Sequence, residues 1–171
     1  MFVVVTRFQQ QRYAYFNGSE SRRADGGVTL DDWCKEHNVN PASSIEHVVD
    51  ECDVLLVLAP GNPEVHERLA ELPLQSGKPL YIDKTFAKDR SMAQRIISTA
   101  AANNTPMMSS SALRFSSALQ EVVNETHKNE NASFAASKGG GSSFAEYSVH
   151  QLEMLVMLMG TGARRVMQTG E

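Results

Sequence analysis

Short apolar runs recur along the first two thirds of the chain and are separated by polar segments that contain turn residues. The clearest run covers residues 53–59, where Val and Leu follow one another without interruption up to Pro60. Such a run is typical of a strand that is buried on both faces of a parallel sheet. Shorter runs predict further strands at residues 2–6, 13–16, 80–82 and 106–108.

Helices are predicted between these strands from capping residues and from the spacing of apolar positions. Thr29 and Ser43 are each followed three positions later by an acidic residue, which is the pattern of a capping box. Asn62 suits the N-cap position and Pro63 the first helical position of a third helix. The helices predicted in this part of the chain cover residues 30–37, 45–51, 62–74 and 89–102.

The alternation of strands and helices predicts an α/β fold, with a parallel sheet that carries helices on both faces. The pattern changes after Ala112, where a long helix is predicted at 113–126 and a polar linker at 127–138. We therefore expect one domain over residues 1–112 and the start of a second, incomplete domain over 113–171. One face of the last predicted helix, residues 143–159, is expected to be core: Phe144, Tyr147, Leu152, Leu155, Val156 and Met159.

Composition and charge narrow the classes of function. The chain has 171 residues and a formal net charge of −4, without a basic block, so nucleic acid is excluded as a main partner. The apolar runs are too short for a membrane-spanning helix, and the N-terminus lacks the basic region of a signal peptide, so we expect a cytoplasmic protein. Cys34 and Cys52 have neither the spacing of a zinc site nor a disulfide framework, which favours buried thiols and no bound metal.

Candidate site residues follow the predicted strands, because ligands of open parallel sheets bind at the carboxyl ends of the strands. Ala59, Pro60 and Asn62 follow one strand, where small residues and a helix N-terminus could receive a phosphate or ribose. An ordinary turn explains these three residues equally well. Asp83 and Lys84, an acid and a base, follow the next strand, and a surface salt bridge is their alternative explanation. After the last strand come residues 109–111, all serine, and then Arg114.

Two histidines are candidate site residues. His66 belongs to the helix predicted after Pro63, although a lone helical histidine is more often a core or capping residue. Glu146 and His150 are four positions apart on the last predicted helix, so the carboxylate could hold the imidazole in orientation. Helical spacing alone also explains the pair without any function.

Four segments of the sequence resemble the Gfo/Idh/MocA family, which includes relatives of glucose-fructose oxidoreductase and inositol dehydrogenase. They are residues 62–66 (NPEVH), 76–85 (SGKPLYIDKT), 111–115 (SALRF) and 147–155 (YSVHQLEML). The order of these segments matches the family, and the resemblance covers roughly residues 50–162. It implies a Rossmann-like domain that binds NAD or NADP, a substrate domain, and hydride transfer at a sugar or polyol carbon.

The resemblance also implies roles for individual residues. Lys84 matches the family lysine that contacts substrate and nicotinamide ribose, and His150 matches the acid/base histidine, so these two are the expected catalytic residues. The expected cofactor-binding residues are Ala59, Pro60, Asn62, His66, Asp83 and Lys84. The expected substrate-binding residues are Ser110, Arg114 and, as a weaker match to a family aspartate, Glu146.

The chain departs from the family pattern in two places. It has no Gly-x-Gly-x-x-Gly motif after its first strand, and it ends at Glu171, where the family continues into a large substrate-domain sheet. We therefore expect a fragment or degraded copy with weak cofactor binding. The partner would be a small-molecule substrate, and self-association into a homo-oligomer is left open. A competing hypothesis is a non-catalytic binding or oligomerisation module with the same ancestry.

Overall fold

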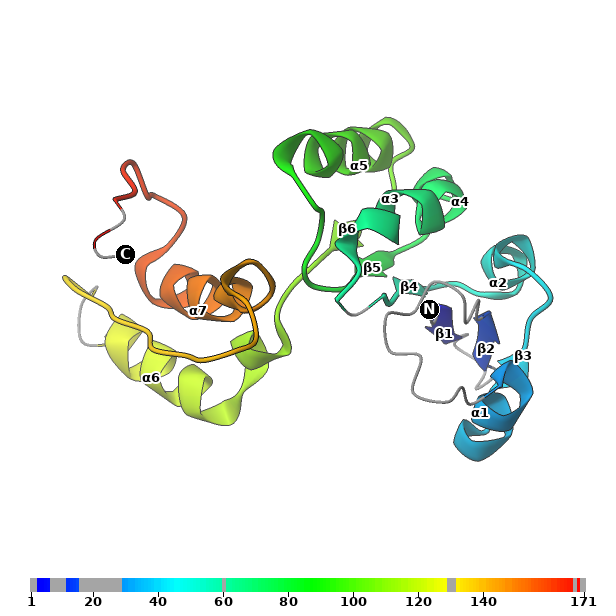
Figure 1. Ribbon diagram of the computed structural model, residues 1–171, viewed down its shortest axis with the longest axis horizontal. Helices are drawn as coiled ribbons and strands as arrows, with labels where there is room; N and C mark the ends of the chain where they lie inside the picture. The colour runs from blue at the N-terminus through cyan, green and yellow to red at the C-terminus, as the bar shows by residue number, and fades with distance from the viewer. Residues whose placement is uncertain are drawn as a thin grey trace. The chain divides into compact units, whose positions relative to one another are not determined.

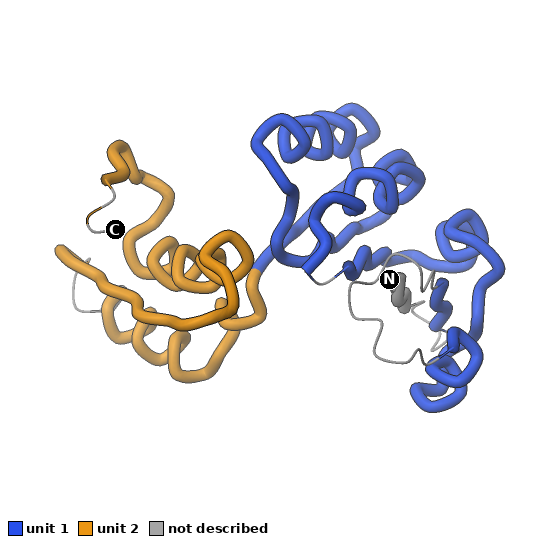
Figure 2. The backbone as a smooth tube through the Cα atoms, viewed as in Figure 1, with its two compact units in different colours: residues 1–110 blue, residues 111–171 orange. Residues whose placement is uncertain are grey.

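The computed structural model describes residues 3–6, 12–15, 29–59, 61–128, 132–167 and 169. The chain divides into two compact units, residues 1–110 and 111–171, which are coloured separately in Figure 2. Residues 17–27 form a polar, glycine-containing stretch, which predicts a loop, and they lie outside the described residues. Among the helices that the structure describes, none has both the length and the apolar character that a membrane span requires.

The central sheet of the first unit consists of three parallel strands, β4 (Leu55–Val57), β5 (Leu80–Ile82) and β6 (Met107–Met108), in that order (Figure 1). Leu55 pairs with Leu80, and Leu80 pairs with Met107. The segments that connect these strands contain helices, as a parallel sheet requires. The predicted order of strands and helices, and the parallel pairing, are therefore confirmed. The connecting elements are η2 (Pro63–Val65), α3 (His66–Leu69), α4 (Glu71–Gln75) and α5 (Arg90–Ala102).

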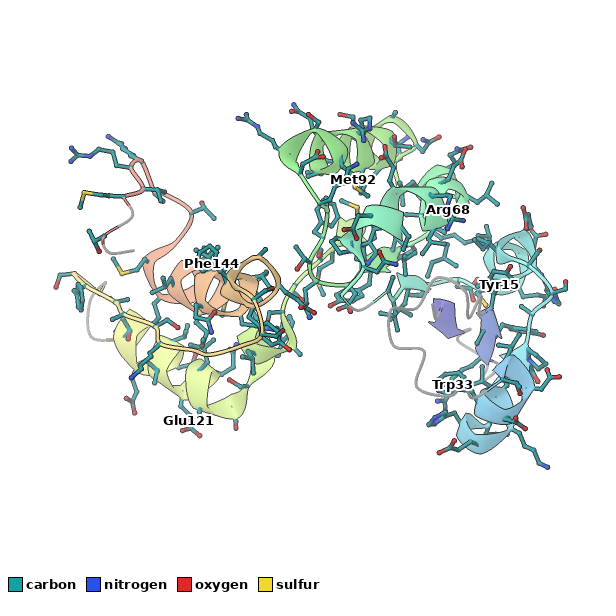
Figure 3. All side chains as sticks on the ribbon, in the orientation of Figure 1. Tyr15, Trp33, Arg68, Met92, Glu121 and Phe144 are labelled. Atoms are coloured by element: carbon teal, nitrogen blue, oxygen red, sulfur yellow. The ribbon has the colours of Figure 1, made fainter. Side chains whose placement is uncertain are left out.

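One face of this sheet forms the main core. Alternate residues of β4 and β5 are fully buried, whereas Leu56 and Tyr81, which point to the other face, are half-buried. Helix α5 covers the buried face with Met92, which Figure 3 labels, and with Ile96. The apolar side chains that meet in this core include Val48, Leu55, Val57, Leu69, Leu74, Leu80, Ile82, Met92 and Ile96.

The helix predicted over residues 62–74 is wrong in one respect, because the structure divides it into η2, α3 and α4. Pro73 explains the division. A proline inside a helix removes a hydrogen bond and clashes with the preceding turn, but it is tolerated in a first turn, where the N–H has no helical partner. The new start at Glu71 places Pro73 in the first turn of α4, and Pro73 itself is buried.

A second sheet of the first unit contains β1 (Val3–Thr6), β2 (Arg12–Tyr15) and β3 (Asn40–Pro41). Strands β1 and β2 pair antiparallel, whereas β2 and β3 pair parallel. Residues 7–11 separate β1 from β2, and a crossover between parallel strands needs a dozen or more residues. Strands β1 and β2 therefore do not form a strand-helix-strand unit.

Helices α1 (Leu30–His37) and α2 (Ile45–Glu51) have the predicted bounds. Thr29 caps α1 as expected, but the cap of α2 is Ser44 and not Ser43, since Ser44 Oγ accepts the His47 backbone N–H. The two helices pack against opposite faces of β2. Ala14 packs with Cys34 of α1, and the neighbouring Tyr13 and Tyr15 pack against the main core.

The second unit contains η3 (Ala112–Phe115), α6 (Ser117–Lys128) and α7 (Phe144–Met159). The helix predicted over 113–126 is wrong at its start, because Ser116 is extended and separates η3 from α6. Ser116 instead accepts the Gln120 backbone N–H with its carbonyl, and the Gln120 side chain donates to the carbonyl of Arg114. These bonds satisfy the backbone at the break.

The predicted core face of α7 is also wrong, since none of its residues is buried. Phe144, labelled in Figure 3, is 86% exposed, and Leu152 and Met159 are exposed as well. Helix α7 contacts η3 and α6 within its unit. Among the described residues, α6, η3 and the segment that precedes α7 do not cover all sides of this largely apolar helix, which explains the difference from the sequence pattern.

The segment that precedes α7 lies directly on that helix. A Cβ at Gly139 would stand 1.7 Å from Gln151 Nε2, and one at Gly141 would stand 2.2 Å from Tyr147 Cγ. Any other residue would therefore push these side chains aside. The glycines allow the backbone to approach α7 closely.

The two cysteines provide a test of this fold. Both thiols are buried, and burial raises the pKa of Cys52 to about 11 and also raises the pKa of Cys34. Because the thiolate is the reactive form, only about one Cys52 in 10³ is ionised at pH 8. We expect Ellman's reagent to label neither thiol rapidly in the folded chain and both in 6 M guanidinium chloride. Rapid labelling of Cys52 without denaturant would contradict the core described above.

Candidate functional site

The carboxyl edge of the β4-β5-β6 sheet collects most of the candidate residues of the first unit. Because β4, β5 and β6 are parallel, the segments that follow them leave the sheet at the same edge. Figure 1 shows the three strands in this order. The structure thus brings to one edge the predicted site residues Ala59, Asn62, Asp83, Lys84 and Ser110. Pro60 lies outside the described residues.

Hydrogen bonds fix the end of β5 to both neighbouring strands. The backbone N–H of Asp83 donates to the Val57 carbonyl, at N···O 2.9 Å, and the Tyr81 hydroxyl donates to the Ser110 carbonyl, at 2.8 Å. Burial raises the pKa of Tyr81, and the charge of Asp83 acts in the same direction, so the phenol stays a donor at neutral pH. Lys84 directly follows this anchored segment and is half-buried.

The turn after β4 differs from the expectation. Asn62 makes no side-chain cap, and its backbone N–H donates to the Ala59 carbonyl, at 3.0 Å, across Gly61, whose φ is +69°. The element that follows is the three-residue turn η2, and the first α-helix after it, α3, has four residues. Such short elements do not provide the aligned N–H groups that bind phosphate. The predicted helix cap is therefore absent at Asn62, and a phosphate or ribose at this turn stays a prediction.

His66 lies inside the protein, behind this edge, and has no exposed area. Its Nδ1 lies 3.0 Å from the Phe86 carbonyl, so Nδ1 must carry the proton and donate it. Burial lowers the pKa of His66, against the opposing effects of the Phe86 carbonyl and the Asp83 charge. The imidazole is therefore neutral at pH 7 and presents a bare Nε2 as an acceptor.

Two buried polar atoms near this edge have no hydrogen-bond partner among the described residues. They are His66 Nε2 and Thr85 Oγ1. The carbonyl of Thr85 also faces the His66 ring, which links the two residues. Buried polar atoms are nearly always paired with protein, water or a ligand. These two atoms are therefore places where a donor group from outside the chain fits.

A second group of polar side chains lies in the second unit around His150. Its Nδ1 is 2.6 Å from Ser111 Oγ, and its ring lies against that of Tyr147, with 5.9 Å between the centroids. The partner that orients His150 is therefore Ser111, and not Glu146 as the helical spacing suggested. The Glu146 backbone N–H donates to Ser143 Oγ, which caps α7. Sequence reasoning placed Ser111 only within a serine run, because residue spacing carries no sign of a contact across 39 positions.

A serine and a histidine at this distance also suggest a nucleophile and its base. Ser111 has no exposed area, and its oxygen also accepts the Leu113 backbone N–H, at 3.1 Å. A nucleophile must reach its substrate, so this burial argues against covalent catalysis by Ser111.

Arg114, expected near the substrate, donates from Nη1 to Glu153 Oε2, at 2.7 Å. Glu153 lies one turn beyond His150 on α7, so the ion pair and the Ser111 bond together fix η3 against this helix. Arg114 is half-buried, and the bond to Glu153 uses one of its five N–H groups, so other donors could bind a ligand.

The expected catalytic pair is divided between the units, with Lys84 in the first and His150 in the second. Their catalytic roles stay a prediction. In the part of the chain that the structure describes, no group of three or more His, Cys, Asp or Glu side chains is arranged to hold a metal ion.

Comparison with known proteins supports the fold. No protein-family model and no curated protein matches the sequence. An NAD-binding protein from Listeria innocua superposes with a TM-score of 0.60 at 17% identity, over 77% of this chain and 45% of that one. An oxidoreductase from Agrobacterium radiobacter, in complex with NAD+, L-tartaric acid and magnesium, gives a TM-score of 0.61 at 16% identity, over 77% and 44%. This chain has a Rossmann-like α/β fold.

A third structure shows the same extent of similarity. A 3-ketoreductase from Actinomadura kijaniata, in complex with TDP-benzene and NADP, gives a TM-score of 0.59 at 16% identity, over 82% of this chain and 46% of that one. The chain thus spans less than half the length of each of these three structures.

The residues present fit one end of a dinucleotide better than the other. Among the described residues, His66 Nε2 and Thr85 Oγ1 lack a hydrogen-bond partner, and a hydroxyl or amide of a nicotinamide riboside is one kind of group that could supply it. The pyrophosphate normally lies on a glycine-rich turn before a crossover helix, and residues 7–11 contain no glycine and connect antiparallel strands.

His66 provides a pH test of the site. Its pKa in the folded chain is lower than the ordinary 6.5, so the unfolded chain binds the proton more readily as the pH falls. The stability that the neutral imidazole contributes is complete above pH 6.5 and is lost as the pH falls through the folded pKa. We expect the urea midpoint of the parent to decrease when the pH is lowered from 7.5 to 5.5. The decrease should be smaller in His66→Asn.

The matched control is the exposed His37, whose His37→Asn variant should keep the parent's dependence on pH. Equal falls in the parent and in His66→Asn would contradict a buried, neutral His66.

Proposed function

We propose that this chain is an oxidoreductase-type protein that holds the nicotinamide end of NAD or NADP at the carboxyl edge of the β4-β5-β6 sheet. Its substrate would be a small hydroxylated molecule, like a sugar or polyol. The observation that carries the proposal is the placement of Lys84 just after β5 and next to Thr85, whose buried Oγ1, like His66 Nε2, has no hydrogen-bond partner among the described residues. Ligands of open parallel sheets bind at this edge, and the similar folds cited above occur in proteins solved with NAD or NADP.

In this proposal the chain supplies binding and proton transfer. The nicotinamide, when bound, gives or takes the hydride. Lys84 and His150 are proposed to hold or move the proton of the substrate hydroxyl. Ser110, Arg114 and Glu146 are proposed to bind the substrate, and Ala59, Asn62, His66 and Asp83 the cofactor.

One observation favours the competing hypothesis of a non-catalytic binding or oligomerisation module. Strands β1 and β2 pair antiparallel, and the sequence between them contains no glycine, unlike the glycine-rich turn that binds pyrophosphate in a Rossmann fold. A chain that keeps the sheet but cannot hold the pyrophosphate could retain the fold without catalysis. Cofactor binding separates the two hypotheses.

The first test compares NADH with reduced nicotinamide mononucleotide by calorimetry. Because the pyrophosphate turn is missing, we expect both to bind weakly and with dissociation constants within roughly threefold of each other. Two charge-assisted hydrogen bonds to pyrophosphate would otherwise favour NADH by about 10² to 10⁴. A low micromolar dissociation constant for NAD or NADP would contradict weak binding, and no binding of either compound would favour the non-catalytic module.

The second test concerns the catalytic pair. With NAD(P)-linked turnover of sugar or polyol substrates followed at 340 nm, Lys84→Ala and His150→Ala should each lower kcat by roughly 10² to 10⁴, the usual contribution of an acid or base. Lys88→Ala is the matched control, because Lys88 is exposed and lies on the same segment. If the parent, Lys84→Ala and His150→Ala have equal rates, the chain does not use this mechanism.

A further inference from the structure

The contact between Ser111 and His150 determines more than the orientation of the ring. Ser111 is buried without exposed area, and two polar groups lie within hydrogen-bond distance of its oxygen. One is the backbone N–H of Leu113, at 3.1 Å, and the other is His150 Nδ1, at 2.6 Å. The Ser111 hydroxyl thus links η3 to α7.

A count of donors and acceptors assigns the direction of each bond. The Leu113 N–H can only donate, so Ser111 Oγ accepts from it. The hydroxyl then has one proton to donate, and His150 Nδ1 is the recorded acceptor for it in the part of the chain that the structure describes. The opposite direction, from Nδ1–H to Ser111, would leave a buried O–H without an acceptor, which is costly.

We propose that Ser111 is a positioning residue that fixes neutral His150 in the tautomer with its proton on Nε2. Nδ1 is then occupied as an acceptor of the Ser111 hydroxyl. The half-buried ring presents Nε2–H as a hydrogen-bond donor. This assignment depends only on residues of the second unit.

The assignment narrows the substrate class, and this part rests on the proposed function. A protonated Nε2 binds a lone pair of a substrate oxygen and cannot accept a proton from a hydroxyl. The neutral imidazole therefore suits a carbonyl oxygen. His150 can take up a hydroxyl proton at Nε2 only after the Ser111 hydroxyl turns and Nδ1 acquires the proton instead. In the resting form of Ser111 and His150, Nε2–H is thus available to bind a carbonyl compound.

The test reads the tautomer directly, from long-range 1H–15N correlation spectra of the full chain labelled with 15N-histidine. The spectra are recorded at pH 8.5, two units above the ordinary histidine pKa of about 6.5. His150→Gln assigns the signal by its loss. We expect the parent to show His150 protonated on Nε2, and Ser111→Thr, which keeps the hydroxyl, to show the same pattern.

Two further variants change the partner of Nδ1. Ser111→Ala removes the donor and should lower the ratio of Nε2-protonated to Nδ1-protonated His150 by roughly 2- to 10-fold, the effect of one hydrogen bond. Ser111→Asp keeps an acceptor for the Leu113 N–H but has no proton to donate, so it should place a proton on His150 Nδ1. Ser117→Ala, at an exposed serine of α6, is the control and should match the parent.

An Nδ1-protonated parent would overturn the proposal, as would a Ser111→Asp spectrum equal to that of the parent. If Ser111→Ala or Ser111→Asp does not fold, the parent and Ser111→Thr still decide, since a difference between these two would also contradict it. The measurement uses neither cofactor nor substrate. Failure of the cofactor-binding tests would therefore remove the carbonyl assignment and leave the tautomer assignment standing.

Discussion

The parallel pairing of β4, β5 and β6 over one buried apolar face is the interaction on which the rest of the first unit depends. Leu55, Val57 and Ile82 have no exposed area and fix the register of the strands, since a shift by one residue would turn them to the other face. The same register sends Lys84 and Ser110 to one edge. The position of the candidate site is thus a consequence of core packing.

Polar groups behind the two candidate sites are held by a small number of directed bonds. In the first unit the Phe86 carbonyl fixes the His66 tautomer and leaves Nε2 as a buried acceptor. In the second unit the Ser111 hydroxyl occupies Nδ1 of His150 and leaves Nε2 as a donor. The two histidines therefore present opposite hydrogen-bonding character, one an acceptor and the other a donor, which the sequence does not indicate. The difference comes entirely from which backbone or hydroxyl group reaches Nδ1.

The errors of sequence reasoning have identifiable causes. Pro73 divides a helix whose apolar spacing looked continuous, because the proline is accepted only in a first turn. The apolar face of α7 looked like core, but periodicity shows only that a face is apolar and does not say what covers it. Ser111 was one of three adjacent serines, and its contact with His150 depends on how η3 packs on α7.

The sequence by itself determined the α/β class, the parallel order of the central strands, the bounds of α1 and α2, and the burial of both cysteines. These features follow from local patterns, since caps, turn residues and runs of Val and Leu act over a few positions. Only the tertiary structure decided that β1 and β2 pair antiparallel, that His66 is enclosed, and that Ser111 holds His150. These features depend on contacts between distant segments, and the direction of a hydrogen bond is set by the group that packing brings to it.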